Sequence, residues 1–74
     1  MMNIMSIHID ETLDSENIKA LKASLTTVPH VFNVELNSAV PHDLMVEYEG
    51  HHNIPVVILG KLAEQGLHTD IQSC

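Results

Sequence analysis

The sequence predicts an α+β fold of order βαββαβ, in which a four-stranded antiparallel sheet with spatial order 4-1-3-2 carries two helices on one face. Four short segments alternate apolar and polar residues with the period of a half-buried strand. Two longer segments repeat apolar residues at intervals of three and four, as amphipathic helices do. Because 74 residues leave room for one small core, we expect a single domain over 1–74 with its core at about 4–71.

The first strand is expected over 3–10, where apolar and polar residues alternate. Its inward positions are Met5, Ile7 and Ile9. A helix follows, since Asp14 and Ser15 are residue types that cap helix N-termini. Its apolar residues recur at helical spacing: Ile18, Leu21, Leu25 and Val28. Pro29 ends this pattern, because the residue before a proline is disfavoured in helical conformation.

Two further strands joined by a hairpin are expected next. The inward residues of the second strand are Val31, Val34 and Leu36, and Phe32 lies off their face. In the third strand, Leu44, Val46 and Tyr48 alternate with Met45, Glu47 and Glu49. The segment 37–43 between them contains Pro41 and is predicted to be the hairpin loop.

The second half of the chain predicts another helix and a last strand. Asn53 is the expected cap, Pro55 suits the first turn and Gly66 ends the helix. The expected inward residues are Ile54, Val57, Ile58 and Leu62. Gly60 within the helix predicts a close approach to the sheet. The last strand, 67–72, directs Leu67, Thr69 and Ile71 to one side and His68 and Asp70 to the other. Two βαβ halves of this length fold as the ferredoxin-like motif.

Composition excludes several function classes. Ten acidic residues against three lysines and no arginine give a formal net charge of −7, the wrong sign for a phosphate backbone or an anionic membrane surface. One Phe, one Tyr and no Trp provide no platform for stacking bases. The sequence contains neither a run of 18 apolar residues nor the cationic start of a signal peptide. We therefore expect a cytoplasmic protein with no nucleic-acid partner and no membrane insertion.

Several stretches resemble the heavy-metal-associated domain family. The segment Leu25-Thr-Thr-Val-Pro-His-Val31, followed by Val34 and Leu36, is similar to the end of the family's first helix, its Pro-Gly-Val turn and its second strand. Val46-Glu-Tyr48 resembles the third strand, and Ile58, Leu62 and Gly66 resemble the second helix and the glycine before strand four. The resemblance spans about residues 4–71. It implies the fold of copper chaperones, mercury-binding proteins and the N-terminal extensions of metal-transporting ATPases.

The family's metal ligands are absent from this sequence. Its members carry a Gly-Met-x-Cys-x-x-Cys loop between the first strand and first helix, where two thiolates hold a soft ion. Asp14 and Asn17 stand at the cysteine positions here, Thr12 at the methionine and Glu11 at the glycine. Carboxylate and amide oxygens are hard ligands, so thiolate-type binding of Cu(I) or Hg(II) is not expected at this loop.

Two groups of histidines are candidate metal ligands. Antiparallel pairing of the first and last strands places His8, Asp10, His68 and Asp70 within cross-strand reach on the open face. Imidazole with carboxylate suits a divalent transition metal such as Zn(II), Ni(II) or Cu(II), and a solvated acidic surface is the alternative. The second candidate cluster, at the opposite end, is His30, His51 and His52, with a polar loop as the alternative.

The expected function is binding rather than catalysis. The chain has no arginine, no glycine-rich cradle and no nucleophile in a recognisable motif. Its single cysteine, Cys74, cannot form an intramolecular disulfide. The leading hypothesis is a heavy-metal-associated-like module without the cysteine site, docking on a metal transporter or a related domain through segment 14–25. The alternatives are a carrier of a divalent metal and a weak homodimer formed through the open sheet face or an edge strand.

Overall fold

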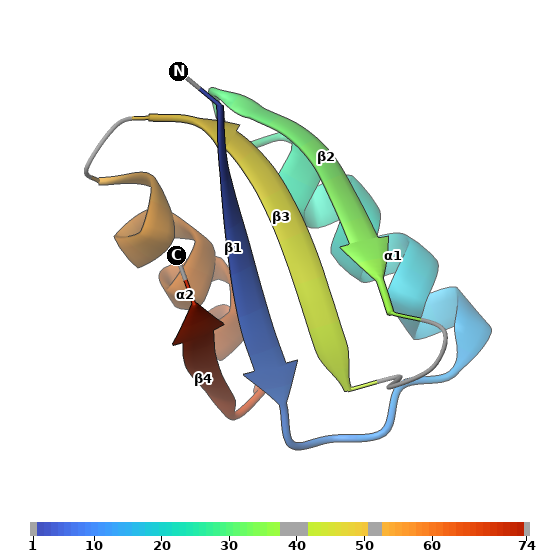
Figure 1. Cartoon of the computed structure of the whole chain (residues 1–74). Coiled ribbons are helices and arrows are strands. Elements are labelled where there is room, and N and C mark those ends of the chain that lie inside the picture. Colours follow the sequence, from blue (N-terminus) through green and yellow to red (C-terminus); the bar gives the residue numbers. More distant parts are fainter. Residues whose placement is uncertain (1, 38–41, 51–52, 74) are drawn as a thin grey trace.

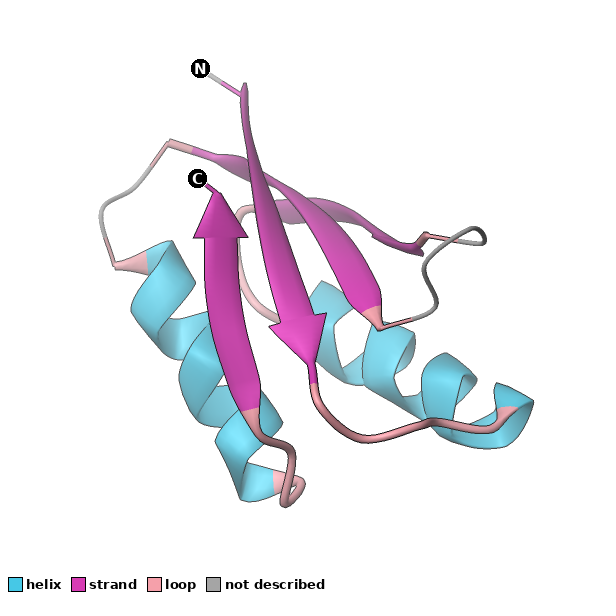
Figure 2. Ribbon diagram, turned by 60° about the horizontal axis from the view of Figure 1, so that its bottom comes forward, coloured by secondary structure: helices cyan, strands magenta, loops and turns pink. Residues whose placement is uncertain are grey.

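The computed structural model describes residues 2–37, 42–50 and 53–73. Its elements are β1 (Met2–Ile9), α1 (Ser15–Thr26), β2 (Val31–Leu36), β3 (Asp43–Glu49), α2 (Ile54–Glu64) and β4 (Thr69–Ser73). The strands form one antiparallel sheet in the order β2-β3-β1-β4 (Figure 1). Both helices lie on the same side of this sheet (Figure 2). The predicted fold class and strand order are confirmed.

The core lies between the sheet and the helices. Its side chains come from alternate positions of the strands and from one stripe of each helix. They are Met5, Ile7, Ile9, Leu21, Leu25, Val28, Val34, Leu44, Val46, Tyr48, Ile54, Ile58 and Leu62. No polar or charged side chain is buried among the described residues. On the opposite side of the sheet, called the open face below, no helix of the described part of the chain is packed (Figure 1).

Helix α2 differs from the prediction in three details. Val57 is 41% exposed, because the buried stripe runs straight along i, i+4 positions from Ile54. Asn53 occupies the N-cap position but makes no side-chain cap hydrogen bond. A Cβ at Gly60 would have no neighbour within 4 Å, so this glycine does not mark close packing. Pro55 lies in the first turn as expected.

The strands agree with the prediction at one irregular place and depart from it at another. The pairing of β2 with β3 shifts register between Val31 and Asn33, and Phe32 at that irregularity is 57% exposed. Extra residues at a bulge lose their fixed side of the sheet, which explains why Phe32 departs from the alternation. Strand β4 begins at Thr69 rather than Leu67, so His68 belongs to the loop before the strand.

The two helices are short, with 12 residues in α1 and 11 in α2. Neither helix in the described part of the chain is long and apolar enough to cross a bilayer.

Candidate functional site

Three chain segments meet at one end of the sheet, here called the loop pole: residues 10–14, the first turn of α1, and residues 65–68 (Figure 2). Backbone hydrogen bonds join residues 10–14 to residues 65–68 and to the first turn of α1, and they join the end of β1 to the residue before β3. The Asp10 amide donates to the His68 carbonyl at 2.9 Å, and the Ile9 amide donates to the His42 carbonyl at 2.8 Å. The pole is therefore a connected surface rather than a set of separate loops.

The start of α1 is held by its own cap. Asp14 has an extended backbone, with φ −77° and ψ 174°, and its Oδ1 accepts a hydrogen bond from the Asn17 amide at 2.8 Å. This bond satisfies one of the amides that a helix N-terminus leaves without a partner. The two positions that correspond to cysteines in the resemblance are thus joined by a capping bond within the chain.

A second contact fixes the loop before the helix. The His68 amide donates to Glu11 Oε1 at 2.8 Å, and His68 Nδ1 donates to Glu11 Oε2 at 2.5 Å. The two hydrogen bonds from His68 lower the pKa of the Glu11 carboxyl. The carboxylate, first by its hydrogen bond and then by its charge, raises the pKa of His68. We call this pair the Glu11–His68 clip.

His8 lies on the open face among carboxylates. Its Nδ1 donates to Asp43 Oδ1 at 3.1 Å, and its Nε2 lies 3.6 Å from Asp10 Oδ1. Asp70 is its backbone partner on β4. Asp43 contacts one nitrogen of the imidazole ring and Asp10 lies near the other. The two carboxylates and the imidazole therefore do not converge on one point.

The first predicted metal cluster is brought together only in part. His8 lies beside Asp10 and opposite Asp70, whereas the His68 side chain turns to Glu11 in the clip. Across residues 2–37, 42–50 and 53–73, no group of three or more His, Cys, Asp or Glu side chains is arranged to hold a metal ion.

Of the second predicted cluster, His51 and His52 lie outside the described residues. Cys74 also lies outside them. His30 occupies the turn after α1 with φ +73°, a left-handed conformation that favours glycine. Its carbonyl accepts from the Glu49 amide at 2.7 Å. The resemblance places a glycine at this position, in agreement with the observed backbone.

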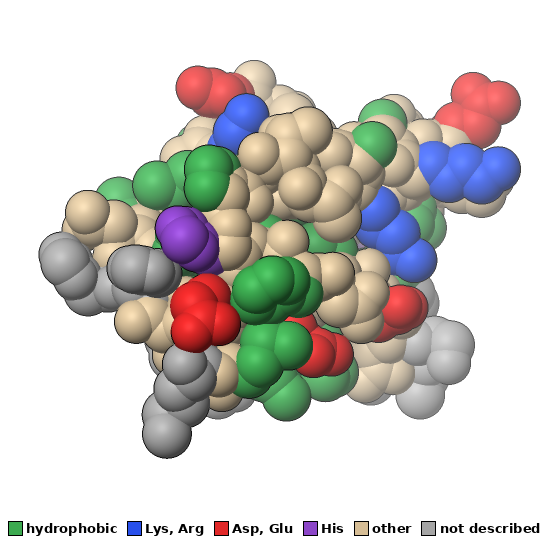
Figure 3. Space-filling model, turned by 90° about the horizontal axis from the view of Figure 1, so that it is seen from above, with side chains coloured by type: hydrophobic (Ala, Val, Ile, Leu, Met, Phe, Trp, Pro, Cys, Tyr) green, Lys and Arg blue, Asp and Glu red, His purple; other side chains and the backbone are tan. Residues whose placement is uncertain are grey.

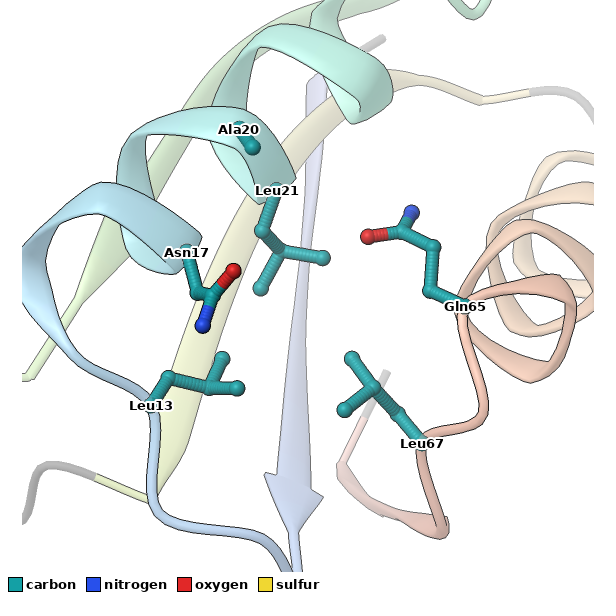
Figure 4. A pocket seen from close by; sticks show the side chains of 6 residues that line it. All are labelled: Leu13, Asn17, Ala20, Leu21, Gln65 and Leu67. Carbon is teal, nitrogen blue, oxygen red and sulfur yellow. The ribbon is translucent and has the colours of Figure 1, made fainter.

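A hollow of about 170 Å³ opens at the loop pole between α1 and the end of α2. We call it the notch. It is lined by Leu13, Asn17, Ala20, Leu21, Gln65 and Leu67. In Figure 4 the leucines form its floor and the amide groups of Asn17 and Gln65 stand on opposite walls. Since a water in liquid takes up about 30 Å³, the notch has room for one side chain of moderate size.

Two long hydrogen bonds orient the amide of Gln65, an exposed residue. Its Nε2 donates to Ser24 Oγ and to the Lys61 carbonyl, both at 3.3 Å. The Oε1 atom points across the notch toward α1 (Figure 4). The notch therefore combines an apolar floor with a hydrogen-bond acceptor on its wall.

The notch and the clip were not foreseen from the sequence. Leu13 had no place in the helical repeat, and Gln65 is an ordinary polar residue near a helix end. Glu11 stands where the resemblance has a glycine, and no local pattern pairs it with His68. One signal for this surface was available in the sequence, because Leu67 is an apolar residue directly after Gly66.

Comparisons with known proteins test the fold independently. No family model and no curated protein sequence matches the chain. Among solved structures, a chain from work on crosstalk between Cu(I) and Zn(II) homeostasis matches with a TM-score of 0.77 and 16% identity, covering 93% of this chain and 97% of that one. The N-terminal domain of PacS from Synechocystis PCC6803 matches with a TM-score of 0.77 and 15% identity, covering 96% and 98%. At these identities the likeness establishes the ferredoxin-like fold.

Proposed function

We propose that this chain is a docking module of the heavy-metal-associated type, which binds a basic segment of a partner protein at the loop pole without a bound metal. The observation that carries the proposal is the notch, which provides an apolar floor and a directed acceptor. It lies next to the acidic chain segment 10–16. The resemblance and the solved neighbours from copper homeostasis favour a transporter or a related domain as partner.

The chemistry of the pole argues against soft-metal transfer as its role. Asp14 uses a carboxylate oxygen to cap α1, and Asn17 supplies the backbone amide that the cap receives. Neither residue offers a thiolate, the ligand that Cu(I) selects. The clip between Glu11 and His68 orders the loop by protein contacts alone. A pole ordered before binding loses little conformational entropy when a partner docks.

The notch best fits the side chain of arginine or lysine. Their aliphatic stems would pack on Leu13 and Leu67, while an N–H group at the end would donate to Gln65 Oε1. The carboxylates at the pole, those of Asp10, Glu11, Asp14 and Glu16, favour a cation there and repel an anion. Opposite potentials also speed encounter, and salt weakens this effect.

A short peptide tests this proposal directly. The probe is acetyl-Ala-Arg-Leu-Arg-Ala-amide, and its control replaces both arginines by citrulline, which keeps the shape and removes the charge. Titration into the ¹⁵N-labelled chain should shift the amide signals of residues lining the notch with the arginine peptide alone. The shifts should weaken as salt rises from 20 to 300 mM.

Two matched variants locate the binding. Ala20→Leu fills the notch on an exposed helix position, where leucine is also a good helix former. Ala23→Leu adds the same group to the same helix away from the notch. We expect Ala20→Leu to weaken peptide binding at least tenfold and Ala23→Leu to leave it unchanged. Equal binding by both variants, or by the citrulline peptide, would refute the proposal.

The second candidate function is a carrier of a divalent transition metal. It rests on His8, which has Asp10 and Asp43 beside its ring and Asp70 opposite on β4. A bound ion would have to draw these side chains to one point, because they do not converge without it. Separate calorimetric titrations with Zn(II), Ni(II) and Cu(II) test it. A carrier would bind one ion per chain at pH 7.5 and release it below about pH 6, when imidazoles protonate. Weak binding with no fixed stoichiometry would remove this candidate.

A further inference from the structure

The open face of the sheet carries a second surface of distinct composition. Met2, Ile4 and Met45 project from neighbouring strands with exposures of 52%, 51% and 40%. The register places Ile4 opposite Glu47 and Met45 opposite Ser6, so Ile4 and Met45 are diagonal neighbours on the same face. Diagonal side chains of this length are within reach of each other. The three therefore form a continuous apolar strip along β1 and β3.

Carboxylates border this strip. Glu47 is directly opposite Ile4, and Glu35 on β2 is directly opposite Met45. Asp43 and Asp70 lie on either side of His8 farther along β1. Figure 3, which looks at the end of the sheet, shows green side chains flanked by red ones along its lower side.

The cations of the chain lie on the other layer. The three lysines are in the helices, Lys19 and Lys22 in α1 and Lys61 in α2, and the sequence has no arginine. Lys22 reaches Glu35 from the helix side at 3.8 Å. The described part of the open face thus has an apolar centre and an acidic border. The strands that form it contribute no lysine or arginine.

The apolar centre and acidic border of the open face indicate which kind of molecule can dock on it. A second copy docking by twofold symmetry would bring the same patch against itself, and its carboxylates would face carboxylates at a cost. Nucleic acid and anionic lipid are repelled for the same reason. An apolar centre inside a charged border is the usual anatomy of a protein interface. We propose that the open face docks an amphipathic basic segment of a partner protein, with an apolar stripe flanked by lysine or arginine.

This surface is separate from the notch. The strip belongs to β1 and β3 on the side away from the helices, whereas the notch is lined by α1 and the residues after α2. The inference therefore does not rest on the proposed function. Two surfaces on opposite layers would let one small module contact two segments at once, which raises avidity when both belong to the same partner.

The experiment uses the intact chain and synthetic helical peptides. The first peptide has 14 residues, with leucine at i, i+3, i+4 and i+7 positions and lysine elsewhere. A second peptide keeps the leucines and replaces every lysine by glutamate, and a third keeps the lysines but scrambles the leucine spacing. We expect saturable amide shifts at residues 4, 6, 45 and 47 with the first peptide only.

Matched variants separate the apolar and charged contributions. Ile4→Ser removes an exposed apolar group from the strip, and Val56→Ser removes one that is 71% exposed on α2. Glu47→Gln removes a charge from the border, and Glu64→Gln removes one from α2. We expect Ile4→Ser to weaken binding about fivefold, as burial of half an isoleucine side chain predicts. Glu47→Gln should weaken it about twofold to threefold, and both α2 variants should bind as the unmodified chain does.

Several results would overturn the inference. One is binding of the glutamate peptide as tight as that of the lysine peptide, and another is a loss of affinity in the α2 variants equal to that in the strand variants. The others are amide shifts confined to the notch and the absence of shifts with any peptide. Sedimentation showing a dimer that Ile4→Ser dissociates would assign the face to a second copy and also overturn it. Shifts confined to the notch would leave the proposed function intact, so the two proposals fail separately.

Discussion

The Asp14→Ala variant should destabilise the protein measurably, because Asp14 acts as the N-cap of α1. Its Oδ1 accepts from the Asn17 amide at 2.8 Å, and alanine would leave this amide without a protein partner. Replacing a capping aspartate by alanine costs about 1 kcal/mol, within a range of about 0.5–2 kcal/mol. In a domain of this size, 1 kcal/mol lowers the melting temperature by roughly 4–8 °C.

The assay is thermal and urea unfolding followed by far-ultraviolet circular dichroism at pH 7. Asp14→Asn is the control, because asparagine caps helices about as well as aspartate. We expect Asp14→Asn to stay within about 0.5 kcal/mol of the unmodified chain. An unchanged melting temperature in Asp14→Ala would refute the capping role. Equal losses in both variants would show that the negative charge near the helix N-terminus, rather than the hydrogen bond, is what matters.

Three further predictions follow from the same structure. The raised pKa of His68 gives stability that is full below the ordinary histidine pKa of about 6.5 and is lost as pH rises through the folded-state value. The lowered pKa of Glu11 gives stability that is full above about 4.3 and is lost on acidification. The free energy of unfolding measured against pH should therefore show a maximum between these values, and His68→Gln should reduce it, because only the backbone hydrogen bond to Glu11 remains. Ile58→Ala, at a fully buried position, should cost about 2–5 kcal/mol in urea unfolding. The double variant Asp14→Cys with Asn17→Cys should gain Cu(I) binding in an anaerobic chelator competition, since two thiolates at that spacing hold a soft ion, and failure to gain it would count against the correspondence of these positions.

The fold was largely predictable because periodicity decides which face of each element is buried. Met5, Ile7 and Ile9 followed strand alternation without exception. The prediction was wrong where tertiary packing decides which of several apolar residues in one helix is buried. Val57 fits a wide helical stripe as well as Ile58 does, but the sheet covers only a narrow one, so Val57 stays exposed.

The candidate site was much less predictable, because it depends on contacts between residues far apart in the chain. The clip joins residues separated by 57 positions, and no local pattern pairs Glu11 with His68. Strand β4 begins two residues later than alternation predicts, which removes His68 from the face it was expected to share with His8. The notch needs the relative placement of α1 and α2, which periodicity alone does not specify.

The most direct test of the central claim is the amide NMR titration of the unmodified chain with acetyl-Ala-Arg-Leu-Arg-Ala-amide, run beside its citrulline control. We expect saturable shifts at Asn17, Ala20 and Leu67 with the arginine peptide, and these shifts should weaken as salt rises. Absence of shifts at these three amides, or equal shifts with the uncharged peptide, would contradict a loop pole built to dock a basic partner.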